Sequence, residues 1–132
     1  MTNLSASSPT LLLALNGLEL TNHFASLLRG AGYGVLPVDG PEDAGRRITE
    51  GSVDLALLDV DWGADTIARL AECARRSERP CPVAVVVGWW DARTAEVAPQ
   101  ADLLIYKPPT QRQLLGSIRL LMDAPQRERL PA

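Results

Sequence analysis

The chain has 132 residues, the usual size of one domain, so we expect a single hydrophobic core. Hydrophobic residues make up 46% of it and charged residues 22%, which excludes a disordered chain, a collagen-like fibre and a small protein held together by disulfides. The formal net charge of −3 provides no basic surface for a phosphate backbone, so we expect no nucleic acid partner.

The first part of the chain alternates between apolar runs and segments with helical spacing. The apolar run at residues 10–15 is too short for a helix and predicts a strand buried on both faces, and residues 33–38 and 54–60 predict two more strands. Helices are predicted between them and after them, at residues 20–31, from Pro41 to about residue 50, and at about 64–76.

The remainder of the chain continues the alternation. Residues 82–87 (PVAVVV) predict the clearest strand, because β-branched residues fill both of its faces. A weak helix is predicted at about 93–97 and a fifth strand at 103–106, and Thr110 is typical of the N-cap of a final helix. Five buried strands alternating with helices predict a doubly wound α/β domain with a parallel sheet, over residues 10–123. Residues 1–9 are predicted to be a disordered N-terminus and 124–132 a polar C-terminal tail.

Two cysteines and the lack of a long apolar segment bear on the surroundings of the protein. Cys73 and Cys81 lie eight residues apart with no second cluster of Cys or His, so we expect free thiols rather than a zinc site or a disulfide. No stretch approaches the roughly 18 apolar residues needed to cross a bilayer. We therefore expect a cytoplasmic protein without a membrane partner.

Polar residues that end strands are the candidates for chemistry, because ligands of open α/β sheets bind at the carboxyl ends of the strands. Asn16 follows the first strand, Asp59 and Asp61 the third, Gly88 the fourth and Lys107 the fifth. Lys107 is the one lysine among 13 basic residues, which suggests a position that needs a compact ammonium group. The sequence thus predicts that Asp59 and Lys107 meet at one edge of the sheet.

Three segments together resemble the receiver domains of bacterial two-component response regulators. Residues 54–59 (DLALLD) resemble the third strand with its terminal phospho-accepting aspartate, and the segment from Ala101 to Pro108 resembles the fifth-strand motif. Residues 32–35 (GYGV) resemble the entry to the second strand. The resemblance runs from about Thr10 to Met122 and implies a flavodoxin-like (βα)5 fold.

The resemblance implies roles for individual residues at the carboxyl edge. It assigns Asp59 as the phospho-acceptor, Lys107 as the cation that contacts the phosphate, and Gly88 as the small residue that leaves room for it. Phosphoryl transfer of this kind depends on neutralising the charge of the phosphoryl group while the aspartate attacks in line. The resemblance also implies a cis peptide bond before Pro108.

Other positions depart from the family pattern. The acidic pair that holds magnesium falls on Leu15 and Asn16, and the hydroxyl position falls on Val87. The aromatic switch position falls on Leu104, with Tyr106 directly before the lysine instead. Because Mg²⁺ is usually held by carboxylates, we expect a weakened or lost magnesium site formed by Asp59, Asp61 and Asn16.

These observations favour an atypical receiver domain, without enzymatic activity, that acts as a protein interaction module with impaired or absent phosphorylation. The alternative is a phosphorylation-competent receiver that accepts phosphate from a histidine kinase on Asp59. A third alternative, a flavodoxin-like domain that binds a small molecule or catalyses a reaction, lacks a glycine-rich phosphate loop and paired catalytic carboxylates. The expected partners are a histidine kinase or other signalling protein, or a second copy bound through the fourth helix, fifth strand and fifth helix.

Trp89 and Trp90 follow the fourth strand and allow two interpretations. In the first interpretation they are an anchor for a partner, since Trp is enriched in binding hot spots. Alternatively, both fold down over the edge of the sheet in place of a phosphate pocket.

Overall fold

The computed structural model describes residues 8–107 and 109–123 and contains one five-stranded parallel sheet. The strands are β1 (Thr10–Ala14), β2 (Gly34–Pro37), β3 (Leu55–Asp59), β4 (Val83–Val87) and β5 (Leu103–Tyr106). The helices are α1 (Leu18–Gly30), α2 (Pro41–Thr49), α3 (Ala64–Arg76), α4 (Ala92–Val97) and α5 (Gln111–Asp123), with the 3-10 helices η2 (Val60–Trp62) and η3 (Ala98–Gln100).

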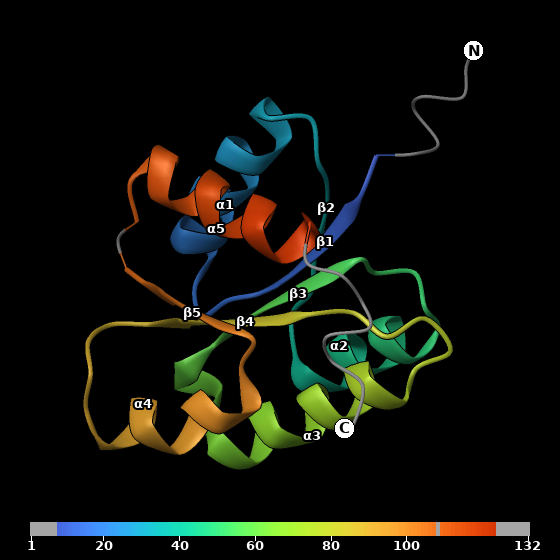
Figure 1. Cartoon of the computed structure of the whole chain (residues 1–132), viewed down its shortest axis with the longest axis vertical. Helices are drawn as coiled ribbons and strands as arrows, with labels where there is room; N and C mark the ends of the chain where they lie inside the picture. The colour runs from blue at the N-terminus through green and yellow to red at the C-terminus, as the bar shows by residue number, and fades with distance from the viewer. Residues whose placement is uncertain (1–7, 108, 124–132) are drawn as a thin grey trace.

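The sheet forms the middle of three layers. Helices α1 and α5 cover one face, and α2, α3 and α4 cover the other (Figure 1). The strand order is β2-β1-β3-β4-β5, so the chain reverses its direction of travel across the sheet between β1 and β3. The predicted doubly wound α/β fold is confirmed, and the ends of β1 and β3 mark the topological switch point of the sheet.

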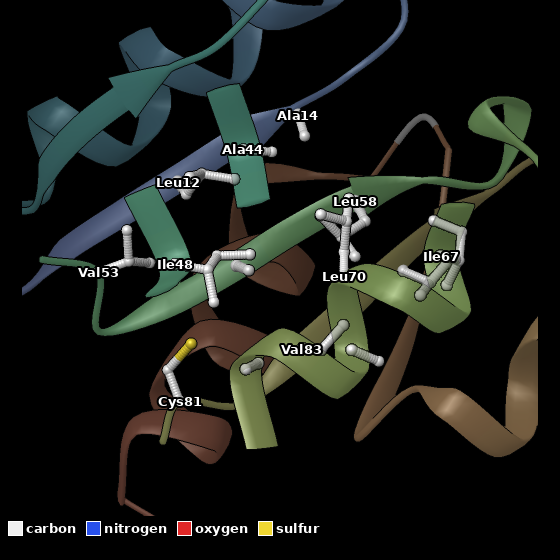
Figure 2. Close-up of a cluster of buried hydrophobic side chains, with 14 of the residues drawn as sticks. Leu12, Ala14, Ala44, Ile48, Val53, Leu58, Ile67, Leu70, Cys81 and Val83 are labelled. Carbon is white, nitrogen blue, oxygen red and sulfur yellow. The ribbon is translucent and has the colours of Figure 1, made fainter. Parts of the chain in front are cut away.

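Both faces of the sheet are apolar, which explains the continuous apolar runs in the sequence. Alternate residues of the central strands enter two separate cores; in β3, for example, Leu57 belongs to the α1 and α5 side and Leu58 to the other side. Figure 2 shows the core beneath α2 and α3, where Ile48, Ile67 and Leu70 pack against Leu58. The same alternation places Asp59 on the side of Leu57, at the end of the strand.

Local signals fix where the helices begin. Asp91 caps α4, because its carboxylate accepts a hydrogen bond from the Thr94 backbone N–H at 3.0 Å. Thr110 and Gln113 form a reciprocal capping box at α5, with both hydrogen bonds at 3.0 Å, which confirms Thr110 as the predicted N-cap. Because Asp91 is its cap, α4 begins at Ala92, one residue earlier than the predicted Arg93.

The structure tests the prediction for the cysteines but leaves most of the two chain ends undescribed. Residues 1–7 of the predicted N-terminus and the whole predicted tail, 124–132, lie outside the described residues. Neither cysteine is in a disulfide, as predicted; Cys81 is buried in the core of Figure 2 and Cys73 is half-buried. Among the described residues, no helix has the length and hydropathy needed to cross a membrane.

Candidate functional site at the carboxyl edge of the sheet

Asp59 ends β3 and is fully buried. Its Oδ2 accepts a hydrogen bond from the Asn16 backbone N–H at 2.9 Å, and its Oδ1 accepts one from the Asp61 backbone N–H at 3.0 Å. Asn16 follows β1 and Asp61 lies in η2, so the carboxylate ties together the segments that follow the two strands at the switch point. A buried carboxylate needs such donors, because an unpaired one would lose its hydration without compensation.

Lys107 follows β5 and completes the surroundings of Asp59. Its backbone N–H donates to the Val87 carbonyl at 2.8 Å, which extends the ladder between β4 and β5 by one residue. Its Nζ lies 3.3 Å from Asp59 Oδ1 and 3.5 Å from Asp59 Oδ2, with 23% of the side chain exposed. The predicted meeting of Asp59 and Lys107 at one edge of the sheet is therefore confirmed, while their roles in phosphoryl transfer stay predictions.

Asp61 is a second carboxylate at this edge, and 31% of its side chain is exposed. Its Oδ2 accepts from the Asn16 side-chain amide at 3.3 Å and lies 3.7 Å from Lys107 Nζ, while its Oδ1 accepts from Arg93 at 2.8 Å. Burial alone raises the pKa of Asp61, but the hydrogen bonds from Asn16 and Arg93 and the charges of Lys107 and Arg93 outweigh it. The net result is a pKa below the ordinary value of 3.8.

A cavity of about 420 Å³ opens beside these charges. Lys107 and Arg93 supply its positive groups. Gly88 also lines the cavity and faces open space, since a Cβ added there would meet no atom within 4 Å. The complete lining is Val60, Asp61, Gly88, Trp89, Asp91, Arg93, Thr94 and Lys107. The cavity therefore combines two cations, two carboxylates and one aromatic side chain.

The remaining predicted site residues do not line this cavity. Val87 is fully buried in the core, Leu104 packs against the same core, and Leu15 is 5% exposed and packs on the opposite face. Asn16 reaches the site, but its amide nitrogen faces Asp61 as a donor. Pro108, with the implied cis bond, lies outside the described residues.

The residues at this edge do not fit a magnesium ion. Mg²⁺ requires free oxygen ligands in near-octahedral geometry and is usually held through carboxylates. All four carboxylate oxygens of Asp59 and Asp61 already accept hydrogen bonds or ion pairs from donors of this chain. Within residues 8–107 and 109–123, no group of three or more His, Cys, Asp or Glu side chains is arranged to hold a metal ion. The expected weakening of the magnesium site stays a prediction.

The two tryptophans after β4 point into solvent. Trp89 is 72% exposed and Trp90 61% exposed. The interpretation that both fold down over the edge of the sheet is wrong, because most of the surface of each side chain stays exposed. The other interpretation, an anchor for a partner, stays a prediction.

Sequence reasoning missed Arg93 and Thr94. Arg93 lies in the first turn of α4 and reaches Asp61 across 32 positions of the chain. Thr94 is buried, and its hydroxyl donates to the Trp89 carbonyl at 2.6 Å, which fixes the loop that leads into α4. Asp91 was the available signal: as an N-cap it places Arg93 at the second helical position, near the carboxyl edge.

No protein-family model and no curated protein matches this sequence. Solved structures do match it at low sequence identity. A response regulator from Thermotoga maritima superimposes with a TM-score of 0.76 at 19% identity, covering 89% of this chain and 99% of that one. A CheY-like receiver domain protein from Methanospirillum hungatei JF-1 gives 0.76 at 19% identity, covering 89% and 95%.

A third match is the receiver domain of a sensor histidine kinase from Pseudomonas aeruginosa PAO1, whose structure has a magnesium ion coordinated in the active site cleft. It superimposes with a TM-score of 0.80 at 16% identity, covering 89% of this chain and all (100%) of that one. The element order and the five-stranded parallel sheet agree with these matches. This chain therefore has the fold of a response regulator receiver domain.

Proposed function

We propose that this chain is an atypical receiver domain of two-component signal transduction that works as a protein interaction module without magnesium-dependent phosphorylation. The proposed role is binding rather than catalysis. The observation that carries it is the closed set of charges at the carboxyl edge, where Asp59 and Asp61 are matched by Lys107 and Arg93.

The chemistry of phosphoryl transfer explains why this closed set matters. An attacking carboxylate needs a free oxygen, and the transferred phosphoryl group needs cations to offset its charge. Both oxygens of Asp59 accept from Lys107 and from a backbone N–H, and the Asp59 side chain has no exposed surface. Leu15 and Asn16 occupy the positions of the acidic pair, so the second cation of the reaction lacks its ligands.

The alternative, a phosphorylation-competent receiver, also has an observation in its favour. Asp59 and Lys107 are adjacent, and Gly88 leaves an open wall beside Lys107. A phosphoryl group on Asp59 could therefore meet the ammonium group if Asp61 and Arg93 moved apart.

Exposed aromatic side chains support the interaction role. Trp89, Trp90 and Tyr106 are exposed large hydrophobic residues at the carboxyl ends of β4 and β5. Large aromatic side chains provide much contact area when they are covered by a partner. We propose a histidine kinase or another signalling protein as the partner, and the face of α4, β5 and α5 as the surface for a homodimer.

The test is incubation with magnesium and acetyl phosphate, followed by intact mass measurement and sedimentation velocity. We expect no added phosphoryl group on the wild type, and the same sedimentation with or without the phosphodonor. The control is Asp59→Asn, which keeps the size of the side chain and removes the acceptor. A phosphoryl group that appears on the wild type and is absent from Asp59→Asn would establish the phosphorylation-competent alternative and exclude our proposal.

A further inference from the structure

Arg93 contacts Asp61 from a different element of the fold. It belongs to α4, while Asp61 belongs to η2, directly after β3. The Arg93 guanidinium donates to Asp61 Oδ1 at 2.8 Å, and 59% of the Arg93 side chain is exposed. Both residues line the cavity, so this contact lies at its wall.

The turn that carries Arg93 is fixed by its neighbours. Asp91 caps the turn through the Thr94 N–H at 3.0 Å, and the buried Thr94 hydroxyl donates to the Trp89 carbonyl at 2.6 Å. The guanidinium is thus presented from a preformed turn, which lowers the entropy lost when it pairs with Asp61.

Two cations of the chain pair with Asp59 and Asp61, without any ion from solution. Lys107 contacts both oxygens of Asp59 and lies 3.7 Å from Asp61 Oδ2, which leaves Asp61 Oδ1 as the oxygen that a second cation can pair with. Arg93 supplies that cation. A divalent metal ion approaching the two aspartates would have to displace the guanidinium and overcome its repulsion.

We infer that Arg93 is a built-in counter-ion of Asp61 that excludes divalent metal ions from this edge of the sheet. The inference deepens the proposed function, on which it rests for its biological meaning, since it names the residue that keeps the site independent of metal. Arg93 is a positioning residue in this role, because it acts on the carboxylates rather than on a reacting group.

The test removes the guanidinium and measures metal binding directly. Arg93→Ala and Arg93→Gln each delete the charge, and Gln keeps most of the side-chain length. Arg119→Ala is the matched control, since it deletes an exposed arginine of α5 and gives the same net charge. Titration with Mn²⁺, followed by paramagnetic broadening of amide NMR signals, reads binding near Asn16, Asp59 and Asp61 without any phosphodonor.

We expect Mn²⁺ to broaden these signals in both Arg93 variants at a concentration about tenfold or more below that needed for the wild type or Arg119→Ala. Adding Asp61→Asn to Arg93→Ala should abolish the gain. The amide spectra also report whether each variant stays folded, which the exposure of Arg93 favours.

Equal broadening in the wild type and both Arg93 variants, or a gain that persists with Asp61→Asn, would overturn the inference. Those results concern metal exclusion alone, whereas the proposed function fails if Asp59 of the wild type is phosphorylated. The two failures are therefore distinguishable.

Discussion

Strand β3 has an aspartate at each end, and the two are built into the fold in parallel ways. Asp54, just before the strand, accepts a hydrogen bond from the Thr10 backbone N–H at 2.8 Å. Asp59, at its end, accepts one from the Asn16 backbone N–H at 2.9 Å. Each therefore joins β3 to an end of β1, and each pairs with one cation.

The cations and their surroundings differ. Arg79 pairs with Asp54 at 2.7 Å, also donates to the Gly51 carbonyl at 3.0 Å, and is 64% exposed. Lys107 is shared between the two oxygens of the fully buried Asp59, and a second carboxylate lies beside it. The same arrangement is thus a solvated clamp at one edge and a buried charge cluster at the other. In the buried cluster, the loss of Asp59 leaves Lys107 and two backbone N–H groups without their buried acceptor.

Replacing the two aspartates by alanine tests this difference most strongly. Asp59→Ala should lower the free energy of unfolding by about 3 to 5 kcal/mol, because Lys107 and two backbone N–H groups lose their buried acceptor. Asp54→Ala should cost about 1 to 2 kcal/mol, since water can replace most of what is lost. Urea denaturation measures both, with the exposed Glu78→Ala as a control expected to change little. Equal losses at Asp54 and Asp59 would contradict the comparison.

Replacing Arg79 by lysine tests the clamp. A guanidinium reaches Asp54 and the Gly51 carbonyl together, whereas an ammonium group lacks its forked geometry. Arg79→Lys should therefore lower the free energy of unfolding by about 1 kcal/mol, the net value of one hydrogen bond. The same denaturation experiment measures it. An unchanged free energy of unfolding would mean that a single positive charge beside Asp54 is sufficient.

The smallest expected effect is the pH dependence contributed by Asp61. Its pKa lies below 3.8 in the folded state, so its contribution to stability is complete above the ordinary pKa and is lost as the pH falls through the folded value. Partial exposure limits this contribution to less than about 1 kcal/mol. Comparing the wild type with Asp61→Asn across acidic pH should show a stability difference that shrinks below pH 3.8. A stability difference that grows below pH 3.8 would contradict the lowered pKa of Asp61.

Much of the fold follows from the sequence because each buried strand is one uninterrupted apolar run. The run 82–87 needed no other signal, and the structure begins β4 at Val83. The meeting of Asp59 and Lys107 was predictable for a related reason: both end strands of a parallel sheet, and such ends share one edge.

The contact of Arg93 could not be predicted in the same way. Helix α4 has 6 residues, too few for a clear apolar stripe, and its starting point depends on the cap made by Asp91. The exposure of Trp89 and Trp90 depends on the path of the loop before that cap, which apolar periodicity does not describe. The arginine that pairs with Asp61 therefore comes from the segment with the weakest sequence pattern.

The two outer strands, β2 and β5, have 4 residues each, and β2 ends in Pro37. Short edges of this kind offer few unpaired backbone groups to a neighbouring chain, and proline lacks an N–H to donate. Two copies of this protein are therefore not expected to join by continuing the sheet from one to the other. Any self-association must rely on side chains, which makes it open to control by single substitutions at the surface.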